Sequence, residues 1–150
     1  MCNHTSAENV VEMFLRKKIE AESFERVEDV MKFLGTIEEY KKAKEMGAGP
    51  TLFSGKMDNR CGKIYIGMTG GTELATKLFG SMAQAGIGTI VSMHVAEDSK
   101  KEADSSHMNI VVTGHMSSDS IGMNFILDDI EKQGIEIIPC SGLIRVSRLR

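Results

Sequence analysis

The stretch that decides the fold runs from residue 109 to residue 148 and reads NIVVTGHMSSDSIGMNFILDDIEKQGIEIIPCSGLIRVSR. The apolar run at residues 110–112 is typical of a strand buried on both faces, and it stops at a glycine. Apolar residues then recur near the 3.6-residue period until a second glycine ends the pattern. The isoleucine-rich residues after that glycine, IEIIP at 135–139, are expected to form the strand that completes the order strand, turn, helix, strand.

His115 follows the first strand of this stretch, and Asp119 lies in what we expect to be the first turn of the helix, with Ser117 or Ser118 as its cap. This is the carboxyl end of a strand, where open α/β sheets usually hold their ligands. An imidazole and a carboxylate one turn apart suit a divalent cation. The alternative is a loop histidine beside an acid that the helix dipole favours.

Strands and helices alternate regularly before this stretch. The pattern predicts strands at residues 63–68 and 89–93 and helices at residues 72–84 and 96–103. The predicted fold class is α/β: a largely parallel sheet of about four strands with helices on both faces, preceded by a helical N-terminal region.

His94 follows one predicted strand just as His115 follows the next. If the two strands are neighbours, about 4.8 Å apart, the two imidazoles and Glu97 share one cleft. Taken alone, His94 is more often a loop residue than a ligand.

Two other polar clusters have weaker signals. The loop that contains Gly70, Gly71 and Thr72 precedes a helix and could bind phosphate through backbone N–H groups, but a tight structural turn is the better interpretation. After the last predicted strand comes a basic segment, for which a solvated tail is favoured over an anion site. Its arginines are Arg145, Arg148 and Arg150.

The first 50 residues predict amphipathic helices at residues 9–19, 27–34 and 37–46, and residues 49–59 predict a loop. We therefore expect one domain over residues 1–150, made of a helical segment (1–50) and an α/β core (62–150).

Composition limits the possible partners. A net charge of −3 predicts no nucleic-acid binding, and no apolar run approaches the roughly 20 residues that span a bilayer. The three cysteines are odd in number and far apart, so neither a disulfide framework nor a thiolate zinc site is expected. A cytoplasmic location is the prediction.

Several of these residues resemble one known family. The run GHMSSDSIGMN, followed by a helix and IEIIPCSG, resembles the C-terminal metal motif of the NGG-one-interacting-factor-three family, whose members are often labelled dinuclear metal-centre proteins or GTP cyclohydrolase type 2 homologues. GKIYIGMTGGTE and GIGTIVSMHVAED are similar to units that precede this motif in one branch. Residues 3–9, NHTSAEN, resemble the family's His-Thr-x-x-Asp element.

The resemblance implies a ligand set. His115 and Asp119 match the family's C-terminal ligand pair, although most relatives have Glu at the second position. Glu8 matches an acidic ligand of the family that is usually Asp. His4 matches the histidine that precedes this acidic ligand. His94 and Glu97 resemble a branch-specific motif. The His-His pair that relatives carry in an N-terminal half does not occur here, so the chain resembles the C-terminal part of such a protein.

The function implied is binding of a divalent metal ion, of unknown identity among Zn, Mn, Fe and Ni. The resemblance also implies hydrolysis of a nucleotide-like or phosphorylated substrate, in which Glu97 or Asp119 orients the attacking water. The alternative is a non-catalytic metal-binding or protein-interaction module with an incomplete site. The family's ring-like assemblies imply a homo-oligomer, and the absent half implies a complementary N-terminal-half chain as the other possible partner.

Overall fold

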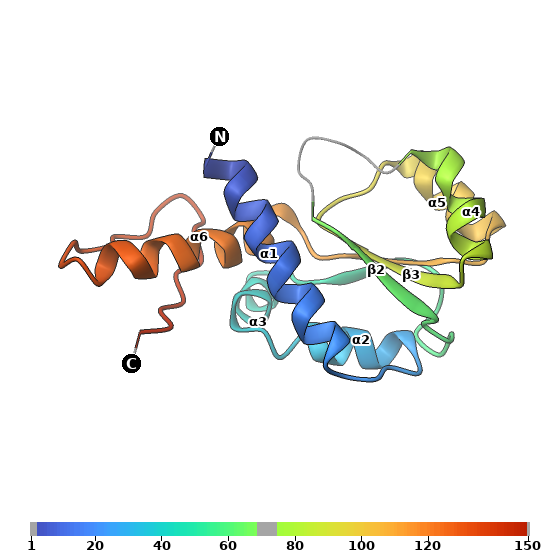
Figure 1. Ribbon diagram of the computed structural model, residues 1–150, viewed down its shortest axis with the longest axis horizontal. Coiled ribbons are helices and arrows are strands. Elements are labelled where there is room, and N and C mark those ends of the chain that lie inside the picture. Colours follow the sequence, from blue (N-terminus) through green and yellow to red (C-terminus); the bar gives the residue numbers. More distant parts are fainter. Residues whose placement is uncertain (1–2, 69–74, 150) are drawn as a thin grey trace.

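The computed structural model describes residues 3–68 and 75–149, with the side chains of residues 3–6 excepted. Three helices come first, and the strands and remaining helices then alternate (Figure 1). The elements are α1 (Asn3–Glu20), α2 (Val27–Leu34), α3 (Glu38–Glu45), β1 (Thr51–Ser54), β2 (Lys63–Gly67), the short 3-10 helix η1 (Thr76–Leu78), α4 (Phe79–Gln84), β3 (Ile87–Ser92), α5 (Glu97–Ser105), β4 (Asn109–Val112) and α6 (His115–Glu131).

The four strands form one sheet in the order β1-β4-β3-β2. β2, β3 and β4 are parallel, whereas β1 pairs antiparallel with β4. The prediction of a largely parallel sheet was therefore wrong in one respect: the sheet is mixed. The antiparallel strand is β1, in a region predicted to be a loop, where Thr51 pairs with Val112 across a long sequence separation.

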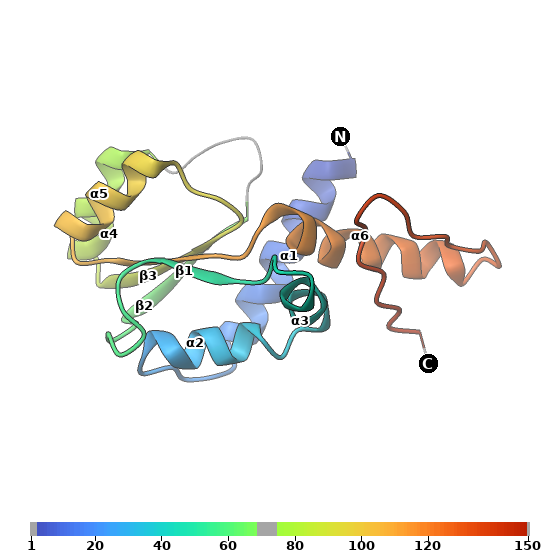
Figure 2. The same cartoon turned by 180° about the vertical axis from the view of Figure 1, so that it is seen from behind.

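Helices cover both faces of the sheet, as the sequence predicted. Along the parallel strands, Ile90 and Ile110 pack in one buried cluster with Phe79 of α4 and Ala103 of α5. Val91 and Val111, the next residues in each strand, pack in the other cluster with residues of α1 and α2. This alternation follows from the two-residue period of a strand. Figures 1 and 2 show α4 and α5 on one side of the sheet and α2 on the other.

The helix that follows β4 begins one turn earlier than expected. Gly114 is its N-cap residue, with a φ of +83°, and no side chain caps the helix. Ser117 and Ser118, the predicted caps, lie inside α6 and are buried. Asp119 consequently lies in the second turn, not the first.

α6 projects past the sheet, and the chain after it runs back along the helix (Figures 1 and 2). Residues 135–139 were predicted to form a strand; they have no strand partner in the described structure, and Ile138 is 77% exposed.

The segment after that run is not a solvated basic tail. Arg145 forms ion pairs with Asp128 and Glu131, at 2.6 and 2.7 Å, and Arg148 reaches Glu39 at 2.6 Å. Glu39 is fully buried and Arg145 nearly so. The prediction of a solvated tail was wrong, because acids on α3 and α6 that are distant in sequence line its path.

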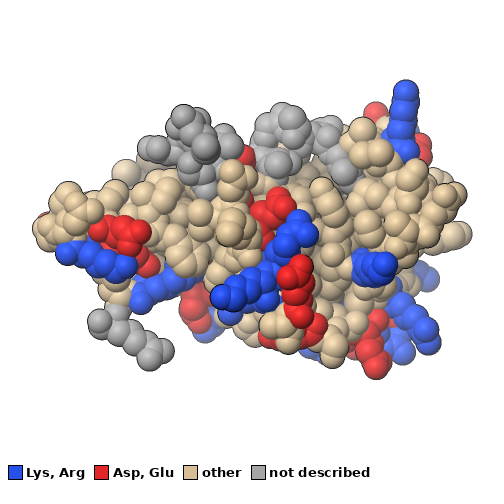
Figure 3. Space-filling model, viewed as in Figure 1, with Lys and Arg blue, Asp and Glu red and all other residues tan. Residues whose placement is uncertain are grey.

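Charge is mixed on the face shown in Figure 3, where acidic and basic side chains lie side by side. Within α1, Arg16 and Glu12 form an ion pair at 2.9 Å. Within the described residues, no helix combines the length and apolar character that crossing a bilayer requires.

Candidate metal site

Two histidines meet at the carboxyl ends of neighbouring strands. His94 lies two residues after β3 and His115 begins α6 after β4, and β3 and β4 are parallel partners. His115 Nε2 lies 2.9 Å from His94 Nδ1, and the rings stack with centroids 4.7 Å apart and planes 22° apart. The topology thus brings together two histidines that are 21 positions apart in sequence.

His115 faces a different partner with each ring nitrogen. Its Nδ1 lies 3.7 Å from Asp119 Oδ2, one helical turn along α6, while its Nε2 faces His94. The positive φ of Gly114 sets this direction, because the chain turns from β4 into α6 in a conformation that residues with a Cβ rarely adopt. In this arrangement Asp119 contacts the ring nitrogen that points away from the other histidine.

Glu8 lies on α1, the helix that packs against α6. α1 packs on α6 so closely that a Cβ on Gly122 would lie 2.2 Å from the backbone oxygen of Ala7. Only glycine at position 122 allows the two helices to approach this closely. Glu8 is 7% exposed, so its carboxylate is inside the protein.

The remaining predicted site residues are placed differently. Glu97 begins α5 and is exposed. The side chain of His4 and all of Gly70, Gly71 and Thr72 lie outside the described residues. Among the residues whose side chains are described, no group of three or more His, Cys, Asp or Glu is arranged to hold one metal ion.

The fourth histidine is far from this pair along the strands. His107 precedes β4, at the opposite end of that strand from His115. It lines a polar groove of about 500 Å³ together with Lys56, Arg60 and Asn109. This separation makes His107 a natural control residue.

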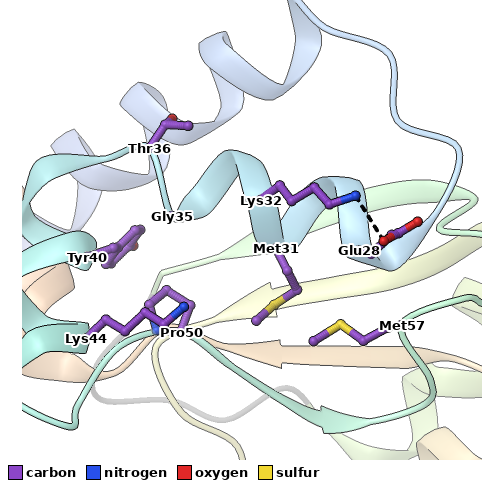
Figure 4. Close-up of a pocket in the computed structure, with 9 residues that line it drawn as sticks. All are labelled: Glu28, Met31, Lys32, Gly35, Thr36, Tyr40, Lys44, Pro50 and Met57. Atoms are coloured by element: carbon purple, nitrogen blue, oxygen red, sulfur yellow. Dashed lines mark hydrogen bonds and ion pairs between the residues drawn. The ribbon is translucent and has the colours of Figure 1, made fainter.

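A larger groove, of about 510 Å³, lies on the α2–α3 side of the protein (Figure 4). The close-up shows the thioethers of Met31 and Met57 on one part of its wall, with Lys32 beside Glu28 at 2.9 Å. Tyr40 borders the groove, but its hydroxyl points into the core, 3.1 Å from Ser118 Oγ. Burial raises the pKa of Tyr40 to about 12, because the phenolate would lose its hydration.

Sequence reasoning missed this groove and the polar core beside it. Tyr40, Thr113 and Ser118 are fully buried and hydrogen-bonded to one another. The signals in the sequence were Thr113, which we placed at the end of an apolar strand, and Ser118, which we interpreted as a possible helix cap.

The fold and the site define an α/β protein with a mixed sheet and a histidine pair at the carboxyl ends of two parallel strands. No family model matches the chain, and no curated protein matches it either. Among solved structures, a NIF3 superfamily protein from Sphaerobacter thermophilus aligns over 91% of this chain and 50% of its own, with a TM-score of 0.70 and 24% identity. A Bacillus cereus protein related to NIF3 aligns over 78% of this chain and 30% of its own, with a TM-score of 0.41 and 16% identity.

The chain therefore has the fold found in part of a NIF3 superfamily protein, and it spans about half the length of the Sphaerobacter protein. NIF3 stands for the family that the motif around His115 resembles. The superfamily indicated by the sequence is thus the one whose fold the chain shares.

Proposed function

We propose that the chain binds a divalent metal ion through the His94–His115 pair. The observation that carries the proposal is the 2.9 Å separation of the two ring nitrogens. Two imidazole nitrogens on one ion, each about 2.0–2.1 Å from it, lie about 2.9–3.4 Å apart for bond angles between right and tetrahedral. The same distance also fits a simple hydrogen bond between the rings, so the proposal needs a direct test.

The described residues fit part of such a site. His94 and His115 supply two nitrogens, and a protein-held ion needs at least one further ligand. Glu8, buried at the start of α1, is the carboxylate that we propose for this role. Asp119 faces His115 Nδ1, where a carboxylate fixes the ring and raises the basicity of Nε2. We propose this orienting role for Asp119 ahead of direct ligation.

Hydrolysis of a nucleotide-like or phosphorylated substrate is the activity that the family resemblance adds. A bound ion would supply Lewis acidity and a water of lowered pKa. The alternative function is metal binding without turnover, as a module that a second copy or a complementary chain completes. The family's His-His pair does not occur in this sequence, and this supports the alternative.

Metal content tests the proposal directly. Purified protein is equilibrated with Zn²⁺, Mn²⁺, Fe²⁺ or Ni²⁺ and analysed for bound metal, beside His94→Ala and His115→Ala, with His107→Ala as the matched control. We expect about one ion per chain, lost in the first two variants and kept in the control.

Two further variants locate the remaining ligand. Loss of metal in Glu8→Gln would show that α1 contributes a ligand. Retention in Asp119→Asn with weaker affinity would support the orienting role. Wild-type protein that stays free of metal after equilibration, or histidine variants that hold as much metal as the control, would refute the proposal. A substrate screen is informative only after metal binding has been established.

A further inference from the structure

Beneath the histidine pair lies a chain of buried hydroxyl groups. Tyr40 Oη lies 3.1 Å from Ser118 Oγ, Ser118 Oγ lies 2.8 Å from Thr113 Oγ1, and Thr113 Oγ1 lies 3.2 Å from the backbone oxygen of Ser92. Tyr40, Thr113 and Ser118 have no measurable exposure to solvent. The chain therefore joins α3, α6 and the ends of β4 and β3 inside the protein.

The directions of these hydrogen bonds follow from their last acceptor. A backbone carbonyl only accepts, so Thr113 must donate to Ser92, and each hydroxyl has a single proton. Ser118 must then donate to Thr113, and Tyr40 to Ser118. Met68 Sδ, at 3.9 Å, is a weaker acceptor for Thr113, and donation from Thr113 to Ser118 would reverse the chain and leave the Tyr40 proton without an acceptor in it. One arrangement of protons thus satisfies the whole chain.

Both histidines are attached to this chain by short links. Ser92 Oγ donates to the backbone oxygen of His94 at 2.8 Å, and Ser118 lies one helical turn after His115. Ser117 Oγ also donates to the backbone oxygen of Thr113, at 2.8 Å. The hydroxyl chain is therefore continuous with the backbone segments that carry the two rings.

We propose that the Tyr40–Ser118–Thr113 chain is a positioning device that holds the first turn of α6 against the ends of β3 and β4, and so sets the contact between His94 and His115. The consequence for metal affinity rests on the proposed function, whereas the consequence for the ring contact does not. Tyr40, Ser118 and Thr113 are positioning residues; none of them touches the proposed ion.

Stability alone does not account for three buried hydroxyls in a row. Replacing hydrogen-bonded partners by apolar groups of the same shape is often nearly neutral for stability, so Phe, Ala and Val at these positions would fill the same space. What an apolar set cannot do is fix the relative position of four elements by directional bonds. The chain thus specifies one arrangement where an apolar core of equal volume allows small shifts.

The test compares two isosteric substitutions in the same sheet. Thr113→Val breaks the middle of the chain. Thr89→Val is the matched control, because Thr89 is also fully buried and its hydroxyl donates to the backbone oxygen of Cys61 at 2.7 Å, away from the histidines. Nuclear Overhauser effects between the His94 and His115 rings are measured at one fixed pH in metal-free protein, and Zn²⁺ affinity is measured by competition with a chromophoric chelator.

We expect Thr113→Val to weaken the ring-to-ring effect and to lower Zn²⁺ affinity about 10-fold, the lower end of what loss of an outer contact of a metal site typically costs. Thr113→Ser should keep the ring-to-ring effect and the Zn²⁺ affinity of the wild type. Thr89→Val should leave both quantities unchanged, although it should lose about as much stability as Thr113→Val. If Thr113→Val does not fold, Tyr40→Phe, which removes only the first hydroxyl, is expected to show the same direction with a smaller effect.

The outcomes separate this proposal from the proposed function. A ring contact that persists in Thr113→Val and Tyr40→Phe as it does in Thr89→Val overturns the positioning role, whatever the metal result. Wild-type protein that shows the ring contact but binds no Zn²⁺ refutes metal binding. The positioning role is then decided by the ring contact in Thr113→Val and Tyr40→Phe. A wild-type protein without the ring contact overturns the positioning role as well.

Discussion

Gly122→Ala should destabilise the protein, although alanine is the better helix former. The added Cβ would lie 2.2 Å from the backbone oxygen of Ala7, 2.6 Å from its carbonyl carbon and 2.7 Å from its Cα. These are backbone atoms of α1, so no side-chain rotation relieves the contact. An ordinary separation requires α1 and α6 to move apart by about 1 Å, which disturbs a close-packed interface.

The magnitude follows from two opposing effects. Alanine gains about 1 kcal/mol over glycine inside a helix. Overpacking of a well-packed core costs about 1–3 kcal/mol, and more where backbone must shift. With a cost at the top of that range, about 3 kcal/mol, we expect a net loss of about 2 kcal/mol, or about 4–8 °C in Tm for a chain of this size.

The assay is urea unfolding followed by far-UV circular dichroism, since the chain has no tryptophan. Gly80→Ala is the matched control: Gly80 lies in α4, and its Cβ would meet nothing within 4 Å, so this variant should be as stable as the wild type or more so. A Gly122→Ala protein that matches Gly80→Ala would refute the close approach of α1 and α6.

Two other predictions concern buried polar groups. Arg148→Met leaves the fully buried Glu39 carboxylate without its cation, so it should lower the free energy of unfolding, measured in urea, by about 3 kcal/mol. The double variant Arg148→Met with Glu39→Gln should lose clearly less stability. Equal losses in the two proteins would argue against a buried ion pair. The pKa of Tyr40 is about 12 in the folded protein and about 10 in the unfolded chain. Above about pH 10 the unfolded chain therefore loses this proton first, so the free energy of unfolding falls as the pH rises from 10 to 12. At pH 11 the loss is about 1.4 kcal/mol, and a pH–stability profile of Tyr40→Phe should lack this component while Tyr65→Phe keeps it.

The sequence predicted the elements whose signals are local. Periodicity placed α2 at Val27–Leu34, and the apolar runs placed β2 and β3 to within two residues. β1 was missed because its four residues follow a Gly-Pro pair and gain their structure from pairing with β4, a contact that no local window contains.

The strand predicted at residues 135–139 failed for a related reason. Its apolar, β-branched residues suit a strand, but a strand also needs a sheet edge within reach. α6 projects beyond the sheet, and Gly134, with a φ of +83°, turns the chain back along the helix instead (Figure 1). Composition alone could not show where the preceding helix points.

Site residues also divide into those with a local signal in the sequence and those that depend on contacts between distant residues. The histidine pair could be predicted, because the carboxyl ends of adjacent parallel strands lie at the same edge of the sheet and each histidine lies within three residues of the end of its strand. The contact between Tyr40 and Ser118 spans 78 positions, and the one between Glu39 and Arg148 spans 109. No spacing rule connects residues so far apart, so the sequence indicated only a possible helix cap at Ser118 and a solvated tail at Arg148.

The two ends of α6 are held by different kinds of interaction. Neutral hydroxyls and the backbone contact at Gly122 fix the part that carries His115. The distal part is held by ion pairs with the chain that returns along it, through Arg145 to Asp128 and Glu131. Salt weakens ion pairs, most strongly at Glu131, whose side chain is 38% exposed, and leaves neutral hydrogen bonds nearly unchanged. Salt should therefore weaken the contacts at the distal end of α6 more than the contacts at its first turn. It follows that the histidine pair depends on the core beneath it more than on the ion pairs farther along the helix.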